Sequence, residues 1–158
     1  MKKIAVIGIG NPLRKDDGIG IFLLDEIKKK KNIFPHKIEL FDGGTGGLNL
    51  IHLFSNYDIV VFIDAMNLKG GTGASRFFKY EDLKLTNSNE CHSSHSLDLI
   101  NIIKISKKMN HNSPDFYFFG IQPKDISFGM DISKELQEKI DSMMENLVNN
   151  VNKLINYN

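Results

Sequence analysis

The sequence is poor in the features that mark secreted, membrane-bound or nucleic-acid-binding chains. Its single cysteine, Cys91, excludes an internal disulfide framework and fits a reducing compartment. No stretch approaches the roughly 20 apolar residues of a membrane-spanning helix, and the apolar run after Met1-Lys2-Lys3 is too short for a signal peptide. A formal net charge of +1 gives no argument for nucleic acid or a membrane surface as a partner. We therefore expect a cytoplasmic protein that binds neither.

Several well-known catalytic patterns are also missing. The chain has no His-Glu-x-x-His pattern, no Cys-x-x-Cys pair and no Gly-Lys-Ser/Thr after a glycine turn. These absences exclude the common zinc proteases, tight structural zinc sites and Walker-type nucleotide loops. The paired Asp-Thr/Ser-Gly motifs of pepsin-like proteases are absent as well.

What the sequence does contain is a regular alternation of strand-like and helix-like segments. Apolar, β-branched runs predict strands at 3–8, 37–41, 58–63, 75–80 and 116–121, with 75–80 at an edge of the sheet. Amphipathic periodicity predicts helices at 17–30, just after Gly47, at 96–108 and at 133–155, where Ser133 is the expected N-cap. Residues 81–93 are polar and predict a loop. This order favours one α/β domain over residues 1–158, a three-layer sandwich with a twisted, largely parallel sheet and helices on both faces.

Polar residues gather where these strands end. Ligands of open α/β sheets bind beyond the carboxyl ends of the strands. Asn11, Asp16 and Asp17 follow the first strand, and Asp64 follows the central one. The second strand ends at Asp42 and a glycine turn, and a cluster with two histidines precedes the 96–108 helix. Written out, these two segments are Gly43-Gly44-Thr45-Gly46-Gly47 and Cys91-His92-Ser93-Ser94-His95.

The opening turn allows two interpretations. Gly8-x-Gly10 matches the start of a dinucleotide-binding turn, and Asp42 stands where a ribose-binding acid belongs. However, Leu13 occupies the third glycine position, and two aspartates at the helix N-terminus would repel a pyrophosphate. A metal or proton-transfer site fits better, because Asp17, Asp64 and His95 offer two carboxylates and an imidazole to a divalent transition metal.

Taken singly, each of these residues also has a structural explanation. Asp17 suits the first turn of a helix, Asp64 suits a turn cap, and His95 suits the start of a surface helix. Cys91 suits a small buried position and His92 a loop. The inference of a metal or proton-transfer site therefore rests on Asp17, Asp64 and His95 taken together.

That combination resembles the hydrogenase maturation proteases, the endopeptidases that process the large subunits of nickel–iron hydrogenases. The resemblance runs from the first strand to about Ser133 and rests on five segments in the same order. They are Gly8-Ile9-Gly10-Asn11-Pro12-Leu13 with Asp16-Asp17-Gly18-Ile19-Gly20, Asp42-Gly43-Gly44-Thr45, Ile63-Asp64-Ala65, Ser94-His95, and Gly120-Ile121-Gln122-Pro123.

The resemblance implies an enzyme that removes a C-terminal extension from the large-subunit precursor after nickel insertion. It implies that Asp17, Asp64 and His95 bind the nickel held by the precursor, although many relatives carry Glu where Asp17 stands. It further implies Asp17 and Asp42 as catalytic acids, and contacts to the substrate from the remaining site residues Asn11, Asp16, Gly43, Gly44 and Thr45.

The same resemblance implies a monomer with no permanently bound cofactor, because the nickel arrives with the substrate. Other divalent ions are expected to occupy the site in vitro. Cleavage by nickel acting as a Lewis acid and cleavage by water activated on a carboxylate both stay open. So do two other functions: a non-proteolytic assembly or binding subunit of a coenzyme F420-reducing hydrogenase, and a nucleotide-binding α/β domain.

Overall fold

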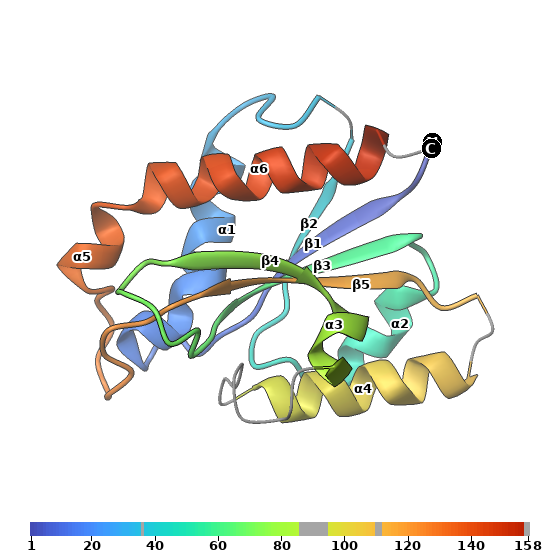
Figure 1. The fold of residues 1–158 in the computed structure, drawn as a ribbon, viewed down its shortest axis with the longest axis horizontal. Coiled ribbons are helices and arrows are strands. Elements are labelled where there is room, and N and C mark those ends of the chain that lie inside the picture. The colour runs from blue at the N-terminus through green and yellow to red at the C-terminus, as the bar shows by residue number, and fades with distance from the viewer. Residues whose placement is uncertain (36, 86–94, 110–111, 157–158) are drawn as a thin grey trace.

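The computed structural model describes residues 1–35, 37–85, 95–109 and 112–156 (Figure 1). Within these ranges, no helix has the length and apolar character needed to cross a membrane. The elements in chain order are β1 (Ile4–Gly8), η1 (Lys15–Gly18), α1 (Ile19–Lys29), β2 (Glu39–Asp42), η2 (Leu48–Leu50), α2 (Ile51–Phe54), β3 (Ile59–Ala65), β4 (Ser75–Lys79), α3 (Tyr80–Leu85), α4 (Ser96–Met109), β5 (Asp115–Ile121), α5 (Lys134–Gln137) and α6 (Ile140–Asn156).

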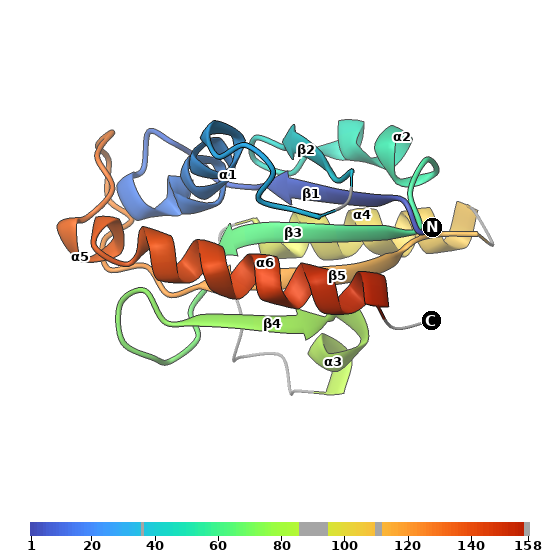
Figure 2. The ribbon, with the colours of Figure 1, turned by 90° about the horizontal axis from the view of Figure 1, so that it is seen from above.

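The described strands form one sheet in the order β2-β1-β3-β5-β4. β2, β1, β3 and β5 run parallel, and β4 pairs antiparallel with β5 at the edge of the sheet. The parallel strands therefore end at one edge of the sheet, and Figure 2 shows β1 and β3 pointing the same way. This arrangement confirms both the predicted sandwich with a largely parallel sheet and the predicted edge strand.

Two apolar cores lie on opposite faces of the sheet. α1 and α6 cover one face, and α2 and α4 cover the other (Figure 1). Successive side chains of β1 alternate between the two cores, with Val6 in the first and Ile7 in the second. β3 alternates in the same way, because Val61 and Phe62 belong to different cores. A strand buried on both faces needs an uninterrupted apolar run, and this need explains the sequence of β3.

Two helix predictions were wrong. Residues 81–85, predicted as part of a loop, and Tyr80, predicted as the end of the edge strand, form α3, because the Asp82 carboxylate accepts the Lys79 N–H at 3.1 Å and so caps the helix start. The predicted helix over 133–155 is broken between α5 and α6, where the Lys139 N–H bonds the Leu136 carbonyl three residues back. Ser133 does precede α5, but its side chain makes no capping hydrogen bond with the described residues.

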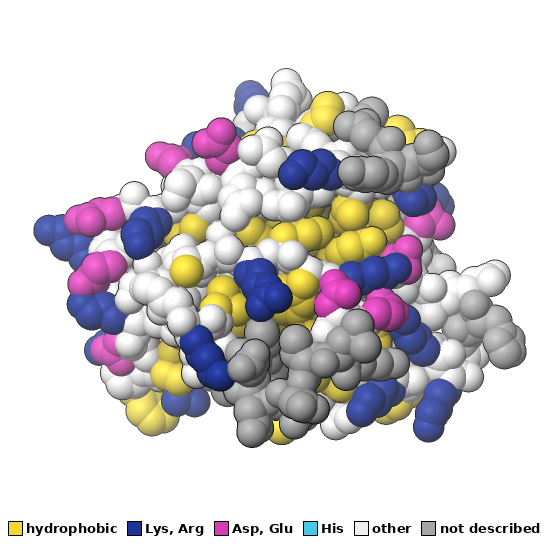
Figure 3. All heavy atoms as spheres, viewed as in Figure 1, with side chains coloured by type: hydrophobic (Ala, Val, Ile, Leu, Met, Phe, Trp, Pro, Cys, Tyr) yellow, Lys and Arg dark blue, Asp and Glu magenta, His cyan; other side chains and the backbone are white. Residues whose placement is uncertain are grey.

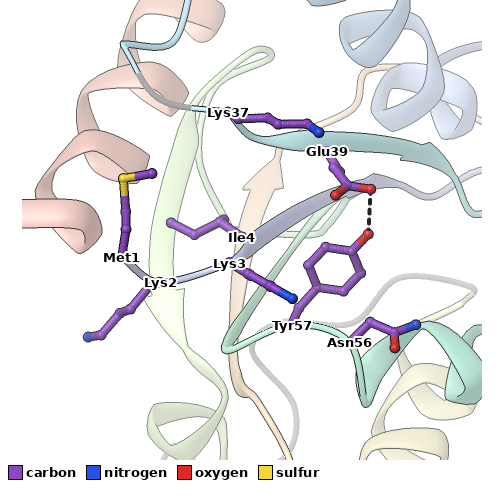
Figure 4. Close-up of a pocket in the computed structure, with 8 residues that line it drawn as sticks. All are labelled: Met1, Lys2, Lys3, Ile4, Lys37, Glu39, Asn56 and Tyr57. Atoms are coloured by element: carbon purple, nitrogen blue, oxygen red, sulfur yellow. Dashed lines mark hydrogen bonds between the residues drawn. The ribbon is translucent and has the colours of Figure 1, made fainter.

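A hollow of about 660 Å³ opens at the amino-terminal edge of the sheet (Figure 4). The Tyr57 hydroxyl donates to Glu39 at 2.8 Å there, and burial together with this bond raises the pKa of Tyr57 to about 12. Figure 4 shows Lys2 pointing away from Lys3 and Lys37, so the three lysines of the hollow do not converge on one point. We assign this hollow no role, because ligands of such sheets bind at the opposite edge.

Candidate functional site

The turn after β1 folds back on itself through close backbone packing. Gly10 has φ +153°, and a Cβ there would lie 2.1 Å from the Asp17 carbonyl oxygen. The Asn11 side chain accepts the Leu13 N–H at 3.0 Å, and the Asn11 N–H donates to Asp17 Oδ2 at 3.1 Å. Gly10 therefore serves packing within the chain, and the Asn11 N–H points at a carboxylate. This geometry argues against the pyrophosphate interpretation of the glycines.

Asp16 and Asp17 are adjacent but serve different purposes. Asp16 is fully buried, and its carboxylate accepts three backbone N–H groups, from Lys124 at 2.9 Å, Asp125 at 3.1 Å and Ser133 at 2.6 Å. These bonds join the turn after β1 to the segment that follows β5. The resemblance implies a substrate contact for Asp16, which stays a prediction; in the structure its covered carboxylate, with three backbone donors, holds two loops together.

We expect the substitution Asp16→Ala to lower the free energy of unfolding by about 2–3 kcal/mol. It leaves three part-buried N–H groups without their acceptor, and an unsatisfied buried donor costs roughly 1–3 kcal/mol, less where water enters. Urea denaturation of the variant checks this value. The matched control Asp131→Ala changes an exposed aspartate of the same segment and should stay within about 0.5 kcal/mol of the wild type. Equal stability of the two variants would contradict the role given to Asp16.

Asp17 forms a buried pair with His95 across 78 residues of sequence. His95 Nε2 lies 2.8 Å from Asp17 Oδ2, and the two residues are 8% and 2% exposed. His95 is held at the start of α4, where its carbonyl accepts the Leu99 N–H. The hydrogen bond to Asp17 raises the pKa of His95 against the opposing effect of burial.

Asp64 belongs to the same cluster. It lies fully buried near the end of β3, in register with Gly120 of β5. The negative charges of Asp17 and Asp64 both raise the pKa of His95, whereas the positive charge of Arg14 lowers it. The three predicted ligands thus come from three different segments, and both carboxylates act electrostatically on His95 at the carboxyl edge of the sheet.

The glycine turn after β2 lies against the turn after β1. The Gly43 N–H donates to the Gly8 carbonyl, and the Gly10 N–H donates to the Gly44 carbonyl, both at 2.8 Å. Asp42 pairs with Gly8 in the sheet register, and its carboxylate accepts the Gly44 N–H at 2.8 Å. The side chain of Asp42 is exposed, unlike those of Asp17 and Asp64.

Metal binding and substrate contact remain predictions for these residues. Within the described part of the chain, no group of three or more His, Cys, Asp or Glu side chains is arranged to hold a metal ion by itself. Two carboxylates and one imidazole are nevertheless suitable donors for a divalent transition metal. Cys91, His92 and Ser94 lie outside the described residues.

Sequence reasoning found Gln122 and Pro123 after β5 but missed residues 124–130, the part of this segment that neighbours the opening turn. Arg14 and Gly129 form a parallel bridge, and Arg14 Nε donates to the Ile126 carbonyl at 3.1 Å. The signal that could have found this segment is the apolar Ile126, Phe128 and Met130 among polar residues. By contrast, Gln122 of the quoted motif has a structural contact, since its side chain accepts the Leu68 N–H at 2.6 Å.

The comparisons of this chain with a family profile, with known sequences and with solved structures agree with one another. Residues 23–150 match the profile of the HycI family, described as hydrogenase maturation protease. This match includes Asp42, Asp64 and His95 but begins after Asp17. The hydrogenase 2 maturation protease of Escherichia coli is 23% identical over 147 residues, which cover 92% of this chain and 88% of that protein.

Solved structures share the fold. The hydrogenase maturating endopeptidase HybD from E. coli has a TM-score of 0.81 at 23% identity, with 96% of this chain and 93% of that chain covered. The NiFe hydrogenase maturation protease HybD from Thermococcus kodakarensis has a TM-score of 0.78 at 24% identity, with coverages of 92% and 96%. At these identities the likeness shows the three-layer fold alone.

Proposed function

Because this chain belongs to the hydrogenase maturation protease family, we propose that it removes the C-terminal extension of a nickel–iron hydrogenase large-subunit precursor after nickel insertion. One observation carries the proposal beyond the family. Asp17 and His95 form a buried pair at the carboxyl edge of the sheet, and the negative charge of Asp64 also raises the pKa of the His95 imidazole. We further propose that the protein acts as a monomer in the cytoplasm.

In this proposal, nickel in the precursor is the signal that the enzyme reads. Two ligands about 2.1 Å from a six-coordinate ion lie about 3 Å apart, and His95 Nε2 and Asp17 Oδ2 are 2.8 Å apart. This spacing suits adjacent positions on one metal ion once the proton between the two atoms has left. Nickel binding would therefore release a proton. A precursor without nickel offers these ligands nothing to bind. The enzyme would therefore bind the nickel-loaded precursor more tightly than the nickel-free precursor.

For the cleavage step we propose Asp42 as the base that activates water. Asp17 is almost fully buried and already accepts bonds from Asn11 and His95, whereas Asp42 is exposed at the same edge. Water would add to the scissile carbonyl as Asp42 takes its proton. The carbon–nitrogen bond would then break as the protonated Asp42 gives that proton to the leaving nitrogen, which restores the carboxylate. Polarisation of that carbonyl by the precursor's nickel is compatible with this role.

The proposal is tested by incubating the purified precursor, with and without nickel, with this enzyme. We expect the nickel-loaded precursor to lose a C-terminal peptide, and we expect the nickel-free precursor to stay intact. Mass spectrometry of both products gives the size of the peptide and the position of the cut. A precursor reloaded with zinc is the control for a general requirement for a divalent ion.

The alternative function predicts a different result. A non-proteolytic assembly subunit would bind the precursor in both states and cleave neither. Binding of the precursor without cleavage would therefore support the assembly subunit and contradict the protease. Equal cleavage of the nickel-loaded and the nickel-free precursor would support the protease and would contradict the proposal that nickel is the signal.

A further inference from the structure

Exposed apolar side chains are concentrated on the segments that build the site. Among the described residues, six of the nine exposed large hydrophobic residues lie on these segments: Leu13, Leu48, Leu97, Ile126, Phe128 and Met130. Four of them, Leu13, Ile126, Phe128 and Met130, belong to two loops that are bonded to one another. We call these four residues the apolar rim. Phe128 is 85% exposed and Met130 is 77% exposed.

The backbone of the apolar rim is held in place. The Lys15 N–H donates to the Gly129 carbonyl at 2.8 Å, and the Gly129 N–H donates to the Leu13 carbonyl at 3.0 Å. The Arg14 guanidinium lies over the Phe128 ring, with 5.9 Å between its carbon and the ring centroid. Asp16 ties the same two loops together through its buried carboxylate. The rim is therefore fixed relative to Asp17, which follows Asp16 directly.

The rim side chains are exposed and add little to the packing of the fold. They belong to neither apolar core, and Figure 3 shows hydrophobic side chains at the lower left, where Figure 1 draws the loop between β5 and α5. Exposed apolar side chains that gather in one region of a soluble protein mark a site of interaction. Aromatic residues and methionine are also enriched in the centres of protein interfaces.

We propose that the apolar rim is the surface on which the folded large-subunit precursor docks, through an apolar patch close to its C-terminal extension. This inference rests on the proposed function. A partner seated on the rim lies directly beside the turn that carries Asp17, so it must leave that site accessible. A protein substrate meets this condition because it extends its own chain into the site. A second copy of this enzyme would obstruct it.

The test compares the double variant Phe128→Ser/Met130→Ser with the control Met109→Ser. Met109 is 74% exposed at the end of α4, so the control removes a similarly exposed side chain outside the rim. Binding of the nickel-free precursor is measured by biolayer interferometry, and cleavage of the nickel-loaded precursor is measured on the same preparations. We expect the double variant to bind about 30-fold more weakly, equivalent to about 2 kcal/mol. Its KM should rise correspondingly at a kcat within about threefold of the wild type.

The two assays separate the inference from the proposed function. The control should bind within about twofold of the wild type, and thermal unfolding should show all three proteins equally stable. If wild-type enzyme binds the precursor without cutting it, the protease proposal fails while the binding comparison still decides on the rim. If the double variant binds as tightly as Met109→Ser, or the wild type does not bind at all, the rim is not the docking surface.

Discussion

Replacing Asp17 by Asn is expected to slow cleavage of the nickel-loaded precursor by roughly a thousandfold, the order of effect seen when one charged or hydrogen-bonding group is removed from a catalytic centre. The amide keeps the size of the carboxylate and still offers an oxygen to the Asn11 N–H, which lies 3.1 Å from Asp17 Oδ2. It removes the negative charge that pairs with His95 and that would bind the metal. The expected defect is therefore chemical and leaves the fold in place.

The measurement is the single-turnover rate of extension removal, followed by mass spectrometry. Asp25→Asn is the matched control, because it makes the same chemical change at an exposed position of α1. We expect this control to cleave within about twofold of the wild type and both variants to unfold at similar denaturant concentrations. A wild-type rate for Asp17→Asn would contradict the proposed role of Asp17 as a nickel ligand and also the catalytic role that the resemblance implies for it.

Much of the architecture could be predicted from local patterns. The continuous apolar runs of β3 and β5 predict strands buried on both faces, and the alternation with helices predicts parallel strands. The two errors share a physical origin. α3 depends on a cap from Asp82 to the Lys79 backbone, and the break before α6 is a local change in hydrogen bonding. Neither feature changes the hydrophobic period on which the prediction depends.

The site was predictable in its location and less so in the role of each residue. The rule that ligands gather at the carboxyl ends of parallel strands places Asp17, Asp64 and His95 at one edge. The sequence could not distinguish Asp16 from Asp17, because the difference arises from the direction in which the turn presents each side chain. The same limit applied to the glycines of the opening turn, whose spacing fits a phosphate loop as well as close packing.

Replacing Gly20 by Ala is expected to lower the free energy of unfolding by more than about 3 kcal/mol, because forcing extra methyl groups into a packed core typically costs about 1–3 kcal/mol even where side chains can move. Here the obstacles are backbone atoms. A Cβ at Gly20 would lie 2.2 Å from the carbonyl oxygen of Ile9 and 2.2 Å from that of Ile63. Alanine gains about 1 kcal/mol in helix propensity over glycine, which is too little to offset this clash.

The same substitution should reduce activity beyond the loss of folded protein. Gly20 lies in the first turn of α1, between the chain after β1 and the end of β3, so a shift of α1 displaces Asp17 and Asp64 together. Gly47→Ala is the control, since no atom lies within 4 Å of its Cβ and its φ of −74° suits any residue. Urea denaturation should place this control within about 1 kcal/mol of the wild type. If Gly20→Ala is equally stable, the glycines of the opening turn are not there for close packing, and a bound ligand would again be the better explanation for them.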